Sequence, residues 1–389
     1  MDWPGNILLY VLLVVAVAIG FLLGRRERRP KKSQTAVIKD YYQGLNFLLG
    51  DRPELGVDKF IQAMEVSDES IDVHLALASV VRRRGEVDKA IRIHQNLLAS
   101  PALKTANKQL IEFELARDYH AAGLLDRAEG LLRDIVARRD AQEKQAVDLL
   151  LDIYEQERDW QQAIVISKRA SNSDNAQKLR LSHFHCELGE SCLKNGEVKL
   201  ASEHARGAVQ VDPSNPRGHW LLALVESSQK RHKLVLRSLR RVAELQPNLG
   251  EELLELFARS AEAMGREHEY LEFLEQALQR SASAKVVGAV LAYQRKHGQL
   301  VDYERMLALI GREPRSEHLP MLLDVMKRSQ QGIDTENGQN LEGVARDLMA
   351  NIVVEVDGHQ CSNCGFTSAA HLWHCPTCKA WGSFSDRAV

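Results

Sequence analysis

The sequence lacks the short motifs that mark common enzyme sites. It has no glycine-rich loop that would cradle a phosphate, no nucleophile elbow and no His-Glu-x-x-His pair, and its 14 histidines are scattered. Net charge is also almost absent, at −2 for 389 residues, so the overall charge does not favour nucleic acid as a partner. We therefore expect a protein without catalytic activity.

Proline is scarce, with 10 residues in the whole chain, and runs of β-branched residues are few between Thr35 and about Arg328. Apolar residues recur in this stretch at positions i, i+3, i+4 and i+7, which is typical of amphipathic helices. Residues 35–328 are therefore predicted to be helical throughout.

Small residues recur within this helical stretch at intervals of 34 to 38 residues. They are Gly56, Ala90, Ala128, Ala163 and Ala201. A second small or apolar residue stands twelve positions before each of them, at Gly44, Ala78, Ala116, Leu151 and Gly189. Turns such as Arg84-Gly85-Glu86 precede several of these positions. The pattern resembles the tetratricopeptide repeat, in which two antiparallel helices cross at small residues.

Three weaker repeats follow, with larger side chains at the crossing position: Val235, Tyr270 and Tyr303. These units are expected to pack more loosely or at a different angle. In all, we expect about eight helical pairs. Because one such pair cannot bury its apolar face alone, the pairs should stack into a superhelix with a concave groove.

The longest apolar run, Ile7 to Leu23, lies near the beginning of the chain. Its 17 residues are at the short end of what spans a bilayer as a helix. Residues 1–32 carry six basic and two acidic side chains, and the basic ones all follow the run. By the positive-inside rule we expect a transmembrane signal anchor whose following chain is cytoplasmic. A cleaved signal peptide is disfavoured, since its positive charge would precede the run.

Cysteine is also rare, and four of the six residues form two Cys-x-x-Cys pairs. Cys361/Cys364 and Cys375/Cys378 are separated by ten residues, a spacing that can aim four thiolates at one zinc or iron ion. Two disulfides are the alternative, which a reducing cytoplasm disfavours. The other two thiols, Cys186 and Cys192, are expected to be buried and inert.

The segments around the cysteines have their own predicted roles. Gln330–Asn340 is polar and predicts a linker, Leu341–Met349 predicts a short helix, and Ile352–Val356 predicts a strand. His371 and His374 lie between the two Cys-x-x-Cys pairs. Four thiolates already complete a closed metal site, so neither histidine is expected to bind the metal. The predicted domains are 1–32 for the anchor, 35–328 for the repeats, 329–351 for the linker and helix, and 352–389 for the metal domain.

Six charged residues are candidates for binding a partner. They are Arg82, Arg83, Arg117, Asp148, Asp152 and Glu155. The three arginines fall on first helices of neighbouring repeats, and the three acids fall on one helical face, where tetratricopeptide proteins line their groove. The alternative is that these charges only solvate the surface.

The order of these features is specific. An anchor with a basic flank, helical repeats and a tail of the form Cys-x-x-Cys-Gly-Phe … Trp-x-Cys-Pro-x-Cys-x-x-Trp resembles the lipopolysaccharide assembly protein B (LapB) family of the bacterial inner membrane. Further stretches that match this family begin at Gly44, Arg84 and Ala121. The chain departs from the family at His359-Gln360, where an aromatic residue is usual, which puts the local packing in question.

The resemblance implies a rubredoxin-type metal domain, packed on the repeats, with Cys361, Cys364, Cys375 and Cys378 as ligands. It also implies an adaptor that helps the membrane protease FtsH degrade the deacetylase LpxC and so limits lipopolysaccharide synthesis. Other lipopolysaccharide synthesis and transport proteins are further partners that it suggests. Two other functions remain open: a general scaffold for envelope biogenesis, and electron transfer through an iron–S4 centre.

Overall fold

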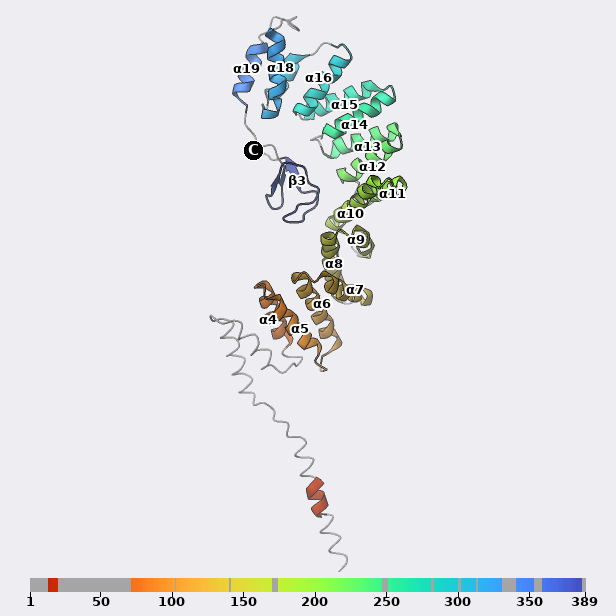
Figure 1. Ribbon diagram of the computed structural model, residues 1–389, viewed down its shortest axis with the longest axis vertical. Coiled ribbons are helices and arrows are strands. Elements are labelled where there is room, and N and C mark those ends of the chain that lie inside the picture. The colour runs from red at the N-terminus through yellow and green to blue at the C-terminus, as the bar shows by residue number, and fades with distance from the viewer. Residues whose placement is uncertain are drawn as a thin grey trace, which may run out of the picture. The chain divides into compact units, whose positions relative to one another are not determined.

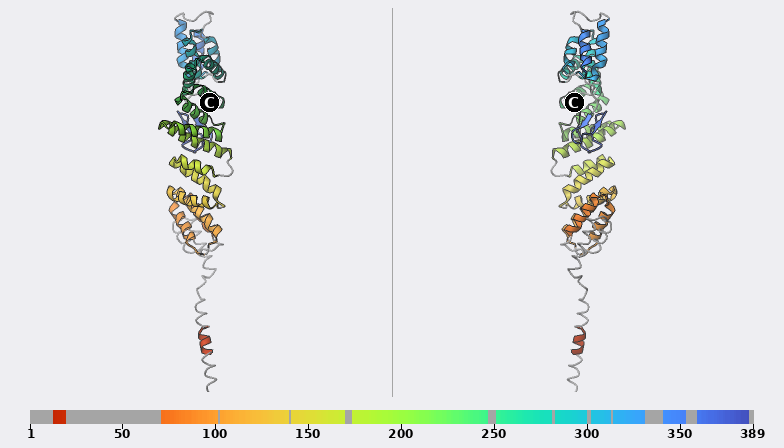
Figure 2. Two further views of the ribbon diagram at one scale, coloured as in Figure 1. Left: turned by 90° about the vertical axis from the view of Figure 1, so that its right-hand side faces the viewer. Right: turned by 90° about the vertical axis from the view of Figure 1, so that its left-hand side faces the viewer.

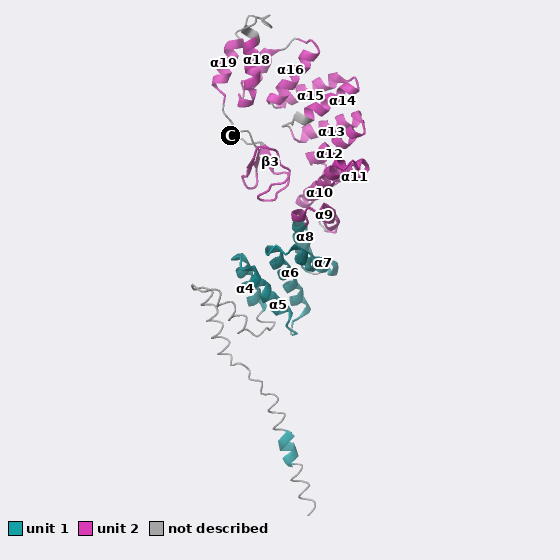
Figure 3. Cartoon of the chain, in the orientation of Figure 1, with its two compact units in different colours: residues 1–153 teal, residues 154–389 magenta. Residues whose placement is uncertain are grey.

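The computed structural model describes residues 13–19, 71–101, 103–139, 141–169, 174–246, 251–280, 283–299, 302–312, 314–330, 341–352 and 359–386 (Figure 1). These residues belong to two compact units, 1–153 and 154–389 (Figure 3). Both units are built mainly of helices, and consecutive helices pack against one another (Figure 2). The predicted all-helical repeat architecture with a small cysteine-containing domain at the end is confirmed.

Between residues 71 and 153, the helices that the structure describes in the first unit are α4 (Ile71–Arg83), α5 (Val87–Leu98), α6 (Thr105–Ala121), α7 (Leu125–Arg138) and the greater part of α8 (Glu143–Glu157). Their core contains Ile71, Val81 and Ile111. A charged cluster lies inside this unit as well. The Asp118 carboxylate is fully buried. It accepts a hydrogen bond from Arg82 (2.7 Å), and it lies 2.5 Å from His94 Nδ1.

The helices of the second unit are α9 (Trp160–Ser167), α10 (Asn175–Lys194), α11 (Val198–Val211), α12 (Pro216–Ser228), α13 (His232–Leu245), α14 (Glu251–Ala263), α15 (Glu267–Arg280), α16 (Ala284–Lys296), α17 (Tyr303–Ile310), the 3-10 turn η1 (Ser316–His318), α18 (Leu319–Gln330) and α19 (Leu341–Ala350). Three short strands follow, β1 (His359–Cys361), β2 (Thr367–Ser368) and β3 (Phe384–Asp386).

The predicted small residues lie where paired helices meet. Ala90, Ala128, Ala163 and Ala201 are each fully buried. Gly189 shows why a small residue is needed, because a Cβ atom there would lie 2.5 Å from Leu221 Cδ2. The earlier positions Gly44 and Gly56 lie outside the described residues.

A left-handed residue ends the first helix of each pair from α4 to α17. Glycine fills this position in five of these turns, as at Gly85 (φ 83°) and Gly196 (φ 79°). The next residue donates its amide hydrogen to the carbonyl five positions earlier, for example Glu86 to Val81 (3.1 Å). This bond satisfies a carbonyl that the helix end would leave free. Arg158 and Lys230 occupy the same position without being glycine.

Two of the three weaker repeats bury the side chain at their crossing position, so looser packing is not found there. Val235 is fully buried and Tyr303 nearly so, in a continuous core that runs from Ala223 to Ala345. Phe257 stacks on Phe273 within it, with ring centroids 4.2 Å apart. In the earlier repeats the helices cross at small residues. In these later repeats large side chains fill the space between the helices.

The predicted helix at 341–349 is present as α19, and it packs on α17 and α18. Its Ala345 is fully buried in the repeat core, so this helix extends the repeats. The predicted linker lies almost wholly outside the described residues, as do the basic flank and most of the apolar run. Residues 13–19 of that run are helical and exposed, and the described residues contain no helix both long and apolar enough to cross a membrane.

Replacing Lys230 by glycine should stabilise the second unit. A left-handed residue with a Cβ is strained, and glycine relieves this strain, although it also adds freedom to the unfolded chain. We expect Lys230→Gly to raise the free energy of unfolding by about 0.5–1 kcal/mol, measured as a higher urea midpoint. Lys230→Ala is the control, because alanine retains the Cβ; an equal gain in both variants would refute the explanation.

Candidate metal centre

The first Cys-x-x-Cys pair forms a tight knuckle at the end of β1. Cys361 donates its amide hydrogen to the Phe366 carbonyl oxygen (2.8 Å), and Gly365 donates to the Cys361 carbonyl oxygen (2.9 Å). Gly365 has a φ of 77°, in the left-handed region where glycine is favoured. The chain therefore reverses directly after the second cysteine and turns both thiols to one side.

The second pair repeats this geometry, although lysine replaces glycine. Cys375 donates to the Ala380 carbonyl oxygen (2.9 Å), and Lys379 donates to the Cys375 carbonyl oxygen (2.9 Å). Lys379 adopts a φ of 58°, in the same left-handed region as Gly365 in the first knuckle. The second turn therefore has the same form as the first, with a lysine in a strained left-handed conformation.

The four thiols converge between the two knuckles. Cys361 Sγ lies 3.6 Å from Cys378 Sγ, Cys364 Sγ lies 3.6 Å from Cys375 Sγ, and all four sulfurs are within 4.8 Å of one another. A disulfide needs about 2.05 Å, so these are separate thiols. Tetrahedral zinc with bonds of about 2.3 Å places its sulfurs about 3.8 Å apart. The donor set and its spacing fit one zinc or iron ion.

The surroundings of one thiol favour the form that binds metal. The Ser383 hydroxyl lies 3.2 Å from Cys361 Sγ, and this contact lowers the pKa of the Cys361 thiol to about 6. A hydrogen bond donated to sulfur stabilises the thiolate, which is the ligand form. Cys361 and Cys375 are buried, whereas Cys364 is exposed.

A three-stranded antiparallel sheet of order β2-β1-β3 supports the first knuckle. The strand predicted at 352–356 lies outside the described residues apart from Ile352. At the departure from the family pattern, His359 packs edge-on against His371 with centroids 5.2 Å apart. Gln360 Nε2 donates to the Gly365 carbonyl oxygen (3.1 Å). These contacts fill the place of the usual aromatic residue.

Trp381, directly after the second knuckle, joins this ribbon (residues 359–386) to the repeats of the second unit. The side chain is buried, and its Nε1 donates a hydrogen bond to Glu155 Oε1 (3.3 Å). Its ring stacks on His183 of α10 at 4.8 Å and meets Trp160 and Phe184 edge-on at 6.0 and 6.1 Å. Trp381 therefore packs against the helices of the repeats.

Trp373 makes a second contact, on the start of α12. The Arg217 guanidinium lies over its ring at 5.9 Å from the centroid. Arg217 is 3% exposed, and its charge is neutralised by Glu187 (2.8 Å) and Glu190 (2.9 Å) of α10. Such a cation over an aromatic face is attracted by the ring quadrupole.

Two of the six predicted partner-binding residues are largely buried and paired inside the chain. The Arg82 side chain is 9% exposed and pairs with Glu114 and Asp118 at 2.7 Å each. Glu155 is 7% exposed, and it accepts from Arg180 (2.9 Å) as well as from Trp381. Both differ from the prediction, because burial and pairing give them structural contacts. Arg83, Arg117 and Asp152 are exposed and Asp148 is half-buried, and for these four the partner role stays a prediction.

The remaining expectations concern cysteine and histidine. Cys186 is fully buried, and burial raises the pKa of its thiol to about 12, as expected of an inert thiol, whereas Cys192 is only half-buried. His374 stacks on Trp381 at 4.3 Å, which is a packing role. The sequence analysis missed His183 and Arg217. A buried histidine and an arginine at a helix start carry no local signal of a contact with a distant domain.

This chain is similar to several known proteins. The profile of a family described as the rubredoxin metal binding domain matches residues 359–386. Lipopolysaccharide assembly protein B of Escherichia coli strain K12 is 30% identical over 383 residues, which cover 97% of each chain. The protein of the same name from Haemophilus influenzae is 28% identical over 390 residues, again 97% of each chain. Among solved structures, a tetratricopeptide repeat protein from Parabacteroides merdae aligns at 11% identity with a TM-score of 0.33, over 72% of this chain and 99% of that chain.

Removing one knuckle's thiols should unfold the ribbon but not the repeats. We expect full-length Cys361→Ser/Cys364→Ser protein to lose its metal, normally about one ion per chain, and the ribbon to become sensitive to protease. Helicity measured by circular dichroism should change little. Cys192→Ser is the control and should keep the metal. A wild-type ribbon that resists protease after chelation would show that the metal is not required for folding.

Acid should weaken the contact between ribbon and repeats through His183. Burial, together with the nearby charges of Arg217 and His374, lowers the pKa of His183 to about 3. In the unfolded chain this histidine has a pKa near 6.5, so below that pH it binds a proton while the folded histidine stays neutral. This stabilisation is therefore complete above about pH 6.5 and is lost as the pH falls from there towards 3.

At pH 5 the loss should be about 1–2 kcal/mol. His183→Phe keeps a ring against Trp381 but cannot titrate. We expect the unfolding midpoint, followed by tryptophan fluorescence, to fall less between pH 7.5 and pH 5 in this variant than in wild type. Release of the metal by acid affects both proteins equally, so identical pH profiles would rule out His183 as the cause.

Proposed function

This chain belongs to the lipopolysaccharide assembly protein B family, and from that membership we propose that it is a non-enzymatic adaptor in lipopolysaccharide assembly at the inner membrane. The observation that carries the proposal is the extent of the match, since 97% of this chain aligns with 97% of its Escherichia coli relative. The aligned part therefore includes both the helical repeats and the ribbon. Helical repeats present extended surfaces for protein partners.

The finer proposal concerns which partners are brought together. The adaptor holds the membrane protease FtsH and the deacetylase LpxC on one scaffold, and it thereby promotes proteolysis of LpxC. Two proteins bound to one tether meet at a raised effective concentration without any new chemistry. Less LpxC then means less lipopolysaccharide. Arg83, Arg117, Asp148 and Asp152 remain candidates for contacts with these partners.

The anchor is part of this proposal. The apolar run Ile7–Leu23 with its basic flank is proposed as a single membrane-spanning helix, with the repeats and ribbon on the cytoplasmic side. The tether confines the adaptor to the surface on which the protease works. A free cytoplasmic adaptor would have to find both partners by diffusion in three dimensions.

The metal has a structural role in this proposal. Cys361, Cys364, Cys375 and Cys378 hold one iron or zinc ion, which cross-links the two knuckles when bound. This chain's own residues do the rest: Trp381 and Trp373 extend from the second knuckle and bind the ribbon to α10 and α12. With four thiolates the site is coordinatively closed, so no position is left for a substrate.

Depleting the protein should lengthen the half-life of LpxC and raise the lipopolysaccharide level. A copy lacking residues 1–32 should fold but restore little of the activity, because it no longer concentrates the partners at the membrane. The measurement is the decay of LpxC after protein synthesis is stopped, in depleted cells that carry either the full-length copy or the copy lacking residues 1–32. An unchanged half-life alongside altered lipopolysaccharide would favour the general scaffold instead.

A further inference from the structure

A hollow of about 830 Å³ opens along α13. Its walls come from α11, α12, α13 and the start of α15, and five cations line it: Lys233, Arg237, Arg240, Arg241 and Arg266. We call this hollow the α13 groove. Three carboxylates also line it: Glu226, Glu244 and Glu269.

The carboxylates do not neutralise all of the cations. Glu269 pairs with Arg240 (2.8 Å) and with Arg266, and Glu244 pairs with Arg241 (2.8 Å). Glu226 is buried, and it accepts a hydrogen bond from Ser238 (3.4 Å). Within the described part of the chain, no carboxylate lies at ion-pair distance from Lys233 or Arg237.

The charges at the start of α13 stand at an unfavourable end of the helix. Lys230, Arg231, His232 and Lys233 follow one another there, and the first turn has no acidic residue. The N-terminus of a helix carries partial positive charge, so each cation there destabilises the helix by a few tenths of a kcal/mol to about 1 kcal/mol. A departure from local preference of this kind is expected where a surface serves binding.

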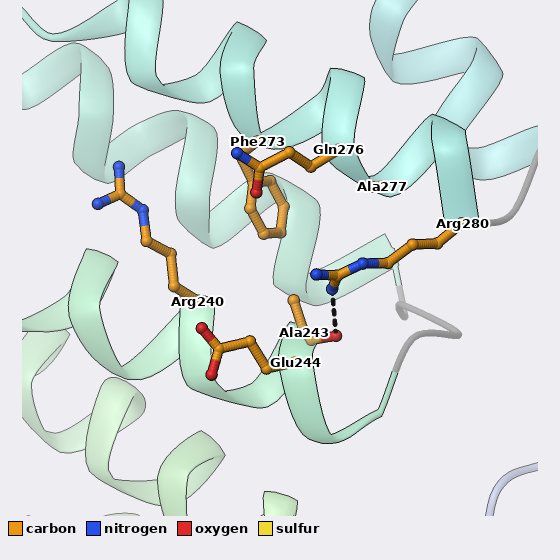
Figure 4. A pocket seen from close by; sticks show the side chains of 7 residues that line it. All are labelled: Arg240, Ala243, Glu244, Phe273, Gln276, Ala277 and Arg280. Carbon is orange, nitrogen blue, oxygen red and sulfur yellow. Dashed lines mark hydrogen bonds between the residues drawn. The ribbon is translucent and has the colours of Figure 1, made fainter.

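The basic surface continues past the groove. Arg240 and Glu244 also line a second, smaller hollow with Phe273 and Arg280 (Figure 4). There Arg280 donates a hydrogen bond to the Ala243 carbonyl oxygen (3.2 Å). Positions 233 to 244 of α13 span about 16 Å at about 1.5 Å per residue. That length matches about five residues of an extended peptide.

The α13 groove and the ribbon use opposite sides of α12. His219, Leu222 and Glu226 line the groove, and at about 100° per residue they cluster on one side of that helix. Arg217, which lies against Trp373 of the ribbon, is on the other side. A ligand in the groove therefore leaves the ribbon in place.

The chemistry of the groove selects among anionic ligands. Its built-in carboxylates would repel the dense phosphates of a nucleic acid, and a flat membrane surface does not enter a hollow. Leu222 and Leu234 add apolar surface beside Lys233 and Arg237, and Leu234 is 37% exposed. A ligand with spaced carboxylates and an apolar residue between them matches both the cations and the apolar surface of the groove.

We propose that the α13 groove binds a short acidic segment of a partner protein, with its carboxylates on Lys233 and Arg237 and an apolar side chain against Leu222 and Leu234. This inference rests on the proposed adaptor function, for which it supplies a docking site. The contact joins exposed charges, so it should weaken as salt rises.

The test is binding of a fluorescein-labelled peptide of about ten residues, in which glutamate and aspartate alternate with leucine, to the purified full-length protein in detergent. Fluorescence anisotropy gives the affinity. We expect Lys233→Glu/Arg237→Glu to weaken binding at least tenfold. Arg92→Glu/Lys285→Glu reverses two other exposed cations and should leave the affinity within twofold of wild type. Unchanged helicity and metal content verify that both variants fold.

Equal losses in the two double variants would overturn the proposal, because only net charge would then matter. It would also fail if vesicles containing phosphatidylglycerol bind through Lys233 and Arg237 while the peptide does not. The half-life of LpxC in cells tests the adaptor function separately. If the peptide does not bind but the protein still shortens the half-life of LpxC, the proposed peptide site in the groove is wrong and the proposed adaptor function is not.

Discussion

Four thiols that bind one metal ion stabilise the folded ribbon, as a hydrophobic core stabilises a larger domain. The ribbon's own core is small: Cys361, Cys375 and Phe384, with Leu372 and Cys378 packed against it. A segment of this size buries too little apolar surface to offset its loss of conformational entropy. Joining the knuckles through one ion supplies the missing free energy. The positions of Trp373 and Trp381 depend on that link, because both flank the second knuckle.

The contact between ribbon and repeats avoids a common cost of buried charge. An unpaired ion under a docked domain would destabilise the contact by several kcal/mol. Here Arg180 already pairs with Glu155, and Glu187 and Glu190 already pair with Arg217, all within the repeats. The ribbon adds an indole hydrogen bond and an aromatic face to charges that are balanced without it. Its own contribution is therefore mainly apolar and aromatic.

The repeats separate their surfaces by helix periodicity. One side of α12 contacts the ribbon through Arg217, and the other side faces the α13 groove through Glu226. Surfaces on opposite sides of one helix can be occupied at the same time. Left-handed turns such as those at Gly196 and Lys230 return the chain to the next helix within a few residues.

The sequence by itself determined the features that arise from neighbouring residues. Cys-x-x-Cys spacing predicts a knuckle because two thiols two residues apart must share a turn, and small residues such as Ala90 and Ala201 predict a crossing because helix periodicity places them on one face. Lys379 was harder, since only the formed knuckle shows that a lysine accepts the left-handed turn. Tertiary structure alone decided the roles of Glu155, Arg82 and His183. Glu155 and Trp381 are 226 residues apart, and a charge on a helix face has the same local pattern whether a solvent molecule, a partner or a folded-back domain covers it.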